Sequence, residues 1–172
     1  MRSAAGLVDY AAMSEANHEL QQRLASHPFL VGMSSNQLEI LTDCATVDQW
    51  DTDHVIFRAG DPARGFYLIE TGSVGVESAP GVADTTVTID VVRTGEPLGW
   101  SWMFEPFVCE YGARTLEPTS AIFFDAAKLT EHRGADLTLG HELFKRMSTV
   151  MVRRLSAARA KILEAAQRGA LG

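Results

Sequence analysis

The sequence predicts a mainly β fold with helices: an antiparallel β-roll or jelly-roll barrel, flanked by short N-terminal helices and one long C-terminal helix. Two observations carry this prediction. Between Thr46 and Asp125, short runs of β-branched and aromatic residues alternate with turns rich in glycine, proline and aspartate, a spacing typical of antiparallel barrels. From Leu137 to Arg168 there is no proline, and apolar residues recur at three- and four-residue spacing, as expected for an amphipathic helix.

Two helices are expected before the β-rich region. Residues 9–26 contain no glycine or proline, and this segment ends at His27-Pro28 because a residue that precedes proline avoids helical dihedral angles. Ser34 or Ser35 can serve as the N-cap of a second helix, which ends before the first strand.

The β-rich region is expected to consist of short strands separated by turns. Gly60-Asp61 indicates a tight turn, and Pro80-Gly81 indicates a hairpin loop. Apolar runs and alternating apolar residues predict strands within these segments: 55–57, 66–69, 74–76, 87–91, 113–117 and 121–125.

The long C-terminal helix is expected to dimerise through its apolar face. At 1.5 Å per residue, a helix of about 28 residues extends for about 42 Å, which is longer than a small barrel can cover. A second copy of the helix is the expected partner, in a parallel two-fold homodimer. The residues predicted to form this interface are Phe144, Met147, Met151, Leu155, Ala158 and Ile162.

These elements divide the chain into four predicted parts. Residues 1–26 form an N-terminal helical segment, and residues 27–133 form the β-roll domain. Residues 134–168 form the long dimerisation helix, and residues 169–172 form a tail.

Composition and charge indicate a cytoplasmic protein without a membrane anchor. The formal net charge of −7 does not favour nonspecific binding of nucleic acid. Cys44 and Cys109 have no metal or redox spacing, which fits a reducing compartment. No apolar run reaches the ~18 residues that a membrane helix needs. The five histidines show no metal-ligand spacing, so we expect no metal site and no enzymatic activity.

An aromatic cluster within residues 95–113 is the most distinctive stretch of the sequence. Its members are Trp100, Trp102, Phe104, Phe107 and Tyr111. Burial in the core, where the indoles would close one end of the barrel, is the commoner fate of such residues. The alternatives are a pocket for an apolar or aromatic ligand and a contact surface for a partner.

The run VIFRAGDPARGFYLIETGSVGVES (55–78) resembles the strand–turn–strand core of the cyclic nucleotide-binding domain family. Residues 95–99, GEPLG, resemble the lead-in to that family's phosphate-binding cassette, and residues 151–155, MVRRL, resemble the dimerisation helix of Crp/Fnr-type bacterial regulators. The resemblance covers roughly residues 27–165. It implies a β-roll with a regulatory, ligand-sensing role.

The resemblance places a ligand pocket, with a degenerate cassette, around ten residues. They are Glu96, Leu98, Gly99, Trp100, Ser101, Trp102, Tyr111, Gly112, Ala113 and Arg114.

Three positions depart from the family's nucleotide-binding pattern. Trp100 stands where the family has a glutamate that holds the ribose hydroxyl, and Trp102 stands where it has a small residue. Tyr111 replaces the arginine that pairs with the cyclic phosphate, and Arg114 lies three positions later, on the opposite face of a strand. A tyrosine cannot supply the charge and bidentate geometry of a guanidinium. We therefore expect no cofactor and weak or absent binding of cyclic AMP and cyclic GMP.

The leading functional hypothesis is a non-enzymatic regulatory or sensor module that acts through another ligand or a partner protein. One alternative is the sensor domain of a Crp/Fnr-type transcription regulator without its DNA-binding part, because the sequence ends at Gly172, soon after the long helix. No sequence-specific DNA binding is expected from a chain without a recognition helix. A ligand-free structural dimerisation module is the other alternative.

Overall fold

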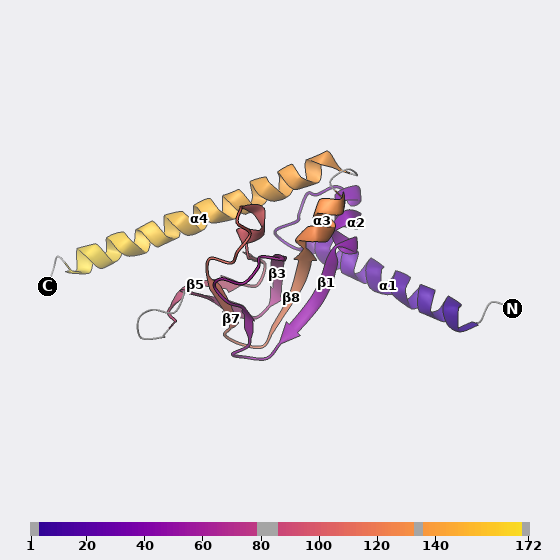
Figure 1. Cartoon of the computed structure of the whole chain (residues 1–172), viewed down its shortest axis with the longest axis horizontal. Coiled ribbons are helices and arrows are strands. Elements are labelled where there is room, and N and C mark those ends of the chain that lie inside the picture. Colours follow the sequence, from indigo (N-terminus) through magenta and orange to yellow (C-terminus); the bar gives the residue numbers. More distant parts are fainter. Residues whose placement is uncertain (1–3, 79–85, 133–135, 170–172) are drawn as a thin grey trace. The chain divides into compact units, whose positions relative to one another are not determined.

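The computed structural model describes residues 4–78, 86–132 and 136–169 (Figure 1). The chain divides into two compact units, Met1–Asp136 and Leu137–Gly172. The first unit contains the N-terminal helices together with all the strands, and the second consists of one long helix. The predicted helical segment 1–26 and the predicted β-roll domain therefore lie in the same unit.

Within the described residues, the helices of the first unit are three α-helices and the 3-10 helix η1. They are α1 (Ala4–Ser26), α2 (Ser35–Asp43), η1 (Ser101–Met103) and α3 (Ala126–Glu131). Ser34 is the N-cap of α2: its hydroxyl accepts a hydrogen bond from the Gln37 backbone N–H at 3.2 Å, while its own N–H donates to the Gln37 side chain at 3.1 Å. This reciprocal capping box satisfies backbone groups that the first turn leaves without intrahelical partners.

Helix α3 was not expected from the sequence. Its N-cap is Asp125, whose carboxylate accepts hydrogen bonds from the backbone N–H groups of Ala127 at 2.8 Å and Lys128 at 3.1 Å. Asp125 is also the last residue of a strand, so the strand passes directly into the helix without a loop to mark the boundary.

The strands form two antiparallel four-stranded sheets. In sequence order they are β1 (Ala45–Trp50), β2 (Val55–Phe57), β3 (Gly65–Thr71), β4 (Ser73–Glu77), β5 (Thr88–Arg93), β6 (Pro97–Leu98), β7 (Gly112–Thr115) and β8 (Thr119–Asp125). One sheet has the order β1-β8-β3-β6 and the other has the order β2-β7-β4-β5. The predicted mainly β fold with flanking helices is confirmed. The predicted hairpin loop at Pro80-Gly81 lies outside the described residues.

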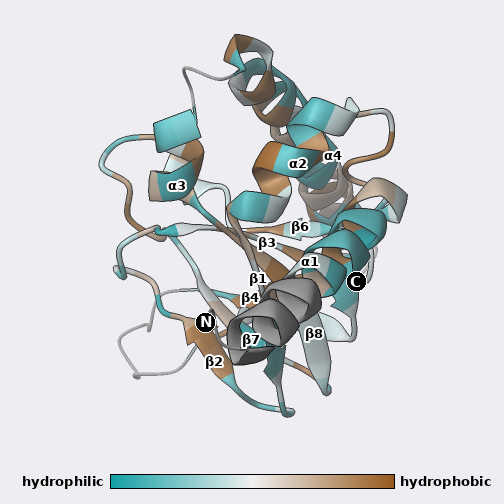
Figure 2. Ribbon diagram, turned by 90° about the vertical axis from the view of Figure 1, so that its right-hand side faces the viewer, coloured by the Kyte–Doolittle hydropathy of each residue, from teal (hydrophilic) through white to brown (hydrophobic). Residues whose placement is uncertain are grey.

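The core of the roll lies between the two sheets. Its buried members are Ile69, Val74, Val92, Leu98, Ala113 and Ala121. Side chains on the outer face of β3 and β8 are also buried, because Phe66, Ile122 and Phe124 are fully inaccessible and Phe29, from the segment between α1 and α2, lies against Phe66. Figure 2 shows apolar residues both on the strands and on α2. The sheet therefore has two apolar sides, of which only one faces the interior of the roll.

The second unit is helix α4 (Leu137–Gly169), which confirms the long helix predicted for residues 137–168. Glu142 pairs with Arg146 one turn later at 2.8 Å, and this pairing lowers the pKa of the Glu142 carboxyl. None of the helices described in the structure is long and apolar enough to cross a membrane.

Candidate functional site

A cavity of about 600 Å³ lies between residues of the two sheets. Both sheets contribute to its walls, together with the turn at residues 61–64 and part of the segment between β6 and β7. The lining residues are Thr46, Asp48, Ile56, Phe57, Asp61, Pro62, Ala63, Arg64, Gly65, Tyr67, Gly99, Ser101, Cys109 and Phe123. A concave site of this size, with mixed apolar and polar walls, is suited to a small organic ligand.

The strand register explains how the first sheet builds one wall of the cavity. Phe123 of β8 lies opposite Thr46 of β1 on one side and opposite Tyr67 of β3 on the other. The Tyr67 and Phe123 rings are 4.8 Å apart between centroids, and Phe57 of the facing sheet stacks on Tyr67 at 6.3 Å. Three aromatic rings from two sheets therefore lie side by side at the cavity.

Asp48 lies in the next row of the same wall. Its partner across the strand pair is Ala121, which in turn lies opposite Ile69. Asp48 is half-buried, and burial raises the pKa of its carboxyl. Within the described part of the chain, its carboxylate makes no hydrogen bond or ion pair.

The remaining polar groups of the cavity differ in exposure. Burial raises the pKa of the Tyr67 hydroxyl to about 12, and the nearby Asp48 and Cys109 reinforce this shift, whereas Arg64 opposes it. Arg64 is exposed, and Asp61 accepts a hydrogen bond from the backbone N–H of Arg58 at 2.8 Å. The cavity therefore combines a protonated phenol with carboxylates of two kinds, one unpaired and one held by the turn.

Neither predicted pocket tryptophan lines this cavity. Gly99 has a positive φ of 82°, and after it η1 places Trp102 on the outer face of the sheet, where it stacks on Phe66 at 5.5 Å. Trp100 meets Phe104 edge-on at 6.0 Å. The turn at Gly99 and the short helix η1 therefore direct both indoles away from this cavity.

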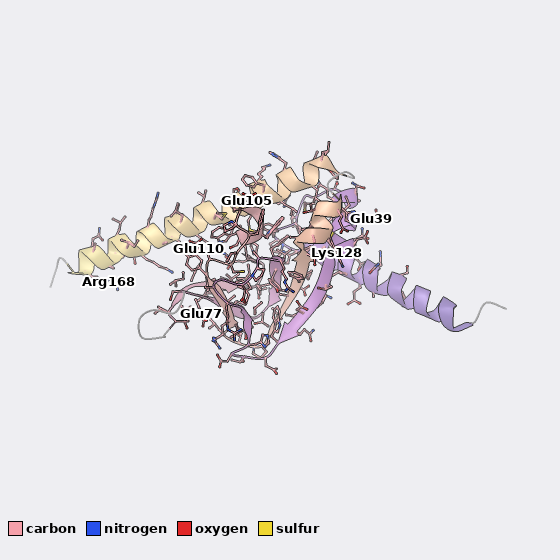
Figure 3. All side chains as sticks on the ribbon, in the orientation of Figure 1. Glu39, Glu77, Glu105, Glu110, Lys128 and Arg168 are labelled. Atoms are coloured by element: carbon pink, nitrogen blue, oxygen red, sulfur yellow. The ribbon has the colours of Figure 1, made fainter. Side chains whose placement is uncertain are left out.

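The Arg114 guanidinium is also engaged away from the cavity. Its Nε donates to Glu77 Oε1 at 2.9 Å and its Nη1 donates to Asp53 Oδ1 at 3.1 Å (Glu77 is labelled in Figure 3). The neighbouring Ala113 belongs to the buried core, so alternation along β7 turns Arg114 outward.

The other predicted site residues have structural roles. The Glu96 carboxylate accepts a hydrogen bond from the Arg93 backbone N–H at 2.8 Å, and Leu98 is buried in the core. Gly112 is buried in β7, next to the half-buried Tyr111. Of the ten residues predicted to bind ligand, Gly99 and Ser101 line the cavity.

The sequence prediction missed the polar residues of the wall, above all Asp48, Arg64 and Tyr67. Alternation along β1 contains a signal, because Thr46, Asp48 and Trp50 share one side of a strand. A carboxylate between two inward positions indicates a polar group inside the roll.

A second, smaller hollow of about 280 Å³ lies on the segment that follows η1. It is lined by Trp100, Ser101, Phe104, Glu105, Pro106, Val108 and Glu110. Phe104 and Phe107 are 39% and 48% exposed. Glu105 and Glu110, both labelled in Figure 3, supply two carboxylates to the lining. The aromatic cluster is therefore split: Trp102 stacks on the buried Phe66, and the other aromatic side chains lie at or near the surface.

The nucleophilic and metal-binding potential of the described residues is small. Across residues 4–78, 86–132 and 136–169, no group of three or more histidine, cysteine, aspartate or glutamate residues is placed to hold a metal ion. Cys44 and Cys109 are free, buried thiols. Burial raises the pKa of Cys44 to about 11 and also raises the pKa of Cys109, so both thiols stay protonated near neutral pH.

Comparison with solved structures shows the same fold in several regulatory proteins. The sensor domain of the transcriptional regulator DNR from Pseudomonas aeruginosa is 21% identical, with a TM-score of 0.65 over 83% of this chain and 95% of that domain. A cyclic nucleotide-binding domain from Methylobacillus flagellatus KT is 19% identical, with a TM-score of 0.70 over 87% of this chain and 83% of that one.

A third similar structure is the regulatory subunit of a cAMP-independent protein kinase A from Trypanosoma brucei. It is 19% identical, with a TM-score of 0.61 over 78% of this chain and 49% of that one.

No curated protein sequence matches the chain. The family model of the cyclic nucleotide-binding domain matches residues 47–133, which include every strand from β2 to β8 and all the residues that line the cavity except Thr46. The chain therefore belongs to the cyclic nucleotide-binding domain family.

Proposed function

We propose that the protein is a non-enzymatic sensor module. Its cavity binds a small molecule, and cyclic nucleotides do not bind there in the family's usual manner. The observation that supports this most strongly is an open cavity that the nearby arginine, a candidate partner for a phosphate, does not face. The cavity carries the unpaired Asp48 carboxylate, whereas Arg114 is engaged by Glu77 and Asp53. A cytoplasmic location fits the two free thiols.

The energetic argument concerns the phosphate of a cyclic nucleotide. A hydrogen bond to a charged group contributes about 1.5–3 kcal/mol, and Tyr111 cannot supply the charge of the missing guanidinium. With the ribose contact also lost at Trp100, binding is expected to weaken by roughly two or more powers of ten. The fold is compatible with such a change, since a regulator of this fold from Trypanosoma brucei is described as cAMP-independent.

Titration calorimetry with cyclic AMP and cyclic GMP tests this proposal. We expect dissociation constants well above the micromolar range for both nucleotides. A micromolar or tighter constant would show that Arg114 or Arg64 turns into the cavity and would contradict the proposal. Mass spectrometry of the protein purified under native conditions is the positive test, and a retained small molecule is the expected result.

A double variant tests whether Trp100 and Tyr111 occupy the positions at which the family has its ribose-binding glutamate and phosphate-binding arginine. Trp100→Glu with Tyr111→Arg restores the family's residues and leaves Trp102, which stacks on the core ring of Phe66, unchanged. We expect this variant to gain measurable affinity for cyclic AMP or cyclic GMP. A folded variant without such affinity would contradict the register that we assign to this segment.

We further propose that the module works as a homodimer through α4. Phe144, Leu155 and Ile162 are 49%, 51% and 67% exposed in the single chain, although all three are large and apolar. Of the remaining predicted interface residues on this helix, Ala158 is exposed and Met151 is half-buried, whereas Met147 is only 3% exposed in the single chain. Exposed apolar side chains at this spacing are typical of a helix that meets a second helix.

Light scattering with Met151→Glu tests the dimer. The substitution places a charge on the apolar face of α4, so we expect it to convert a dimer into a monomer at micromolar concentration. Ala160→Glu adds the same charge at an exposed position on the opposite side of the helix and should leave the dimer intact. A wild-type monomer would contradict the proposal.

The alternative role in transcription has a separate test. A net charge of −7 does not favour duplex DNA, and we expect no sequence-specific binding by this chain. A specific footprint that survives about 200 mM salt would favour a DNA-binding regulator, because purely electrostatic binding weakens steeply with salt.

A further inference from the structure

We infer that the cavity recognises an organic cation, a protonated amine or amidine carried on an apolar or aromatic body, with the Asp48 carboxylate as its partner. This inference rests on the proposed sensor function, because it names the chemical class of the ligand that the cavity takes.

The position of Asp48 is the first step. The carboxylate stands on the inner side of β1, in the row formed with Ala121 and Ile69, and it lines the cavity. Ala121 has only a methyl group, so no large side chain of β8 stands between Asp48 and the interior of the roll. A half-buried carboxylate without a partner among the described residues lacks the compensation that such groups normally have, and a ligand cation would supply it.

The aromatic wall next to Asp48 is the second step. Tyr67 and Phe123 stand one row away on the same sheet, which corresponds to about 7 Å along a strand. Phe57 approaches Tyr67 from the facing sheet, with 6.3 Å between ring centroids. A cation held by Asp48 would thus lie within reach of aromatic faces, which attract cations through their quadrupoles. The same rings offer an apolar surface to the body of the ligand.

The other charged groups of the cavity also favour a ligand whose cationic end lies beside Asp48. The groups that face the cavity include two carboxylates, Asp48 and Asp61, and one guanidinium, Arg64, so negative charge is in formal excess. Asp61 is held by the Arg58 backbone N–H, and Arg64 is exposed to solvent. An anionic ligand group placed beside Asp48 would face repulsion, whereas a cation is favoured there and a polar or anionic end is tolerated beside Arg64.

A series of three probes of similar shape tests the charge preference of the cavity. They are 2-phenylethylamine, 2-phenylethanol and phenylacetate, which are cationic, neutral and anionic at pH 7. Titration calorimetry should show that the amine binds roughly tenfold to a hundredfold more tightly than the alcohol, as expected for a charge-assisted hydrogen bond. Phenylacetate should bind most weakly of the three.

The variant Asp48→Asn assigns the preference to one residue. It keeps the size of the side chain and removes the charge, so the amine and the alcohol should then bind with similar affinity. Glu39→Gln removes a carboxylate from an exposed position of α2, outside the cavity, and should preserve the preference (Figure 3 labels Glu39). Circular dichroism checks that both variants are folded, and the probe series on the wild-type protein does not depend on either variant.

The outcomes separate this inference from the proposed function. An amine that binds no more tightly than the alcohol, or a preference that persists in Asp48→Asn, overturns the inference. If phenylacetate binds best, the inference fails and the sensor function stands, because the cavity still takes a ligand. If no probe binds and no small molecule is retained by the purified protein, both the inference and the sensor function fail.

Discussion

The two faces of the β1-β8-β3-β6 sheet are built from neighbouring residues but differ in how they are filled. On β3, Phe66 is fully buried on the outer face, where it stacks on Phe124 at 4.7 Å and on Trp102 at 5.5 Å. The next residue, Tyr67, faces inward and borders the cavity. One face of the strand is closed by close-packed rings, and the other leaves room for a ligand.

The charged residues of the two faces differ in the same way. On the outer face, the Glu70 carboxylate is held by both Arg23 Nε, at 2.9 Å, and Arg23 Nη2 of helix α1. On the inner face, Asp48 has no such partner among the described residues, and burial raises its pKa. The outer face thus holds a paired carboxylate, while the inner face keeps an unpaired one that disfavours the unliganded state. Such groups are more often found at binding sites than in a structural core.

The largest expected effect is the loss of an aromatic ring from the outer face. Phe66→Ala should lower the free energy of unfolding by about 3–5 kcal/mol, because it leaves a cavity among rings that already touch. Tyr67→Ala should cost less, since its ring borders volume that is already open. Urea titration measures both values, and Phe107→Ala, at a side chain that is 48% exposed, serves as the control. Equal costs at Phe66 and Tyr67 would contradict the contrast between the faces.

A smaller effect is expected from the ion pair on the outer face. Arg23→Met should lower the free energy of unfolding by about 1–2 kcal/mol, because it leaves the Glu70 carboxylate, 17% exposed, without its cation. Arg23 itself is 35% exposed, and solvent screening limits the effect. A double-mutant cycle with Glu70→Gln isolates the pair. Strictly additive costs would show that the contact contributes nothing.

Local sequence signals predicted the elements better than they predicted the cavity. Ser34 and Gln37 sit three residues apart and produce the capping box of α2, so both signals lie within one turn. Strand β1 shows the opposite case. An apolar residue is expected to point inward, yet Val47 is 39% exposed and Asp48 lines the cavity. The pairing with β8 decides which side of β1 faces inward, and no local pattern contains that pairing.

The position of Arg114 illustrates the same limit for the candidate site. Its partner Glu77 lies on β4, two residues beyond Gly75, which is the residue directly opposite Arg114. This diagonal contact depends on the register between two strands that are far apart in the sequence. The resemblance to the family could place the cassette but not the direction of its indoles, which the turn at Gly99 and the short helix η1 determine.

The smallest expected effect on stability concerns Asp48 and depends on pH. Burial raises the pKa of this carboxyl above its ordinary value of 3.8, so the folded protein binds the proton more tightly than the unfolded chain does. The ionised carboxylate therefore lowers the free energy of unfolding above the raised pKa, and this cost disappears as the pH falls below 3.8. Asparagine titrates in neither state. Asp48→Asn should thus raise the stability at pH 7 by less than about 1 kcal/mol.

Thermal unfolding at a series of pH values, with Glu39→Gln as the control, measures this difference. The advantage of Asp48→Asn should be largest near neutral pH and should shrink as the solution becomes acidic. A variant that is less stable than the wild type at pH 7 would show that the carboxylate has a favourable partner in the folded protein. Adding 2-phenylethylamine should reverse the order at pH 7, because a ligand that binds the folded wild type more tightly than the variant stabilises it more. The Asp48 carboxylate would then lower the stability of the ligand-free protein and raise the stability of the ligand-bound protein. The Glu70 carboxylate on the outer face is already paired and cannot have both effects.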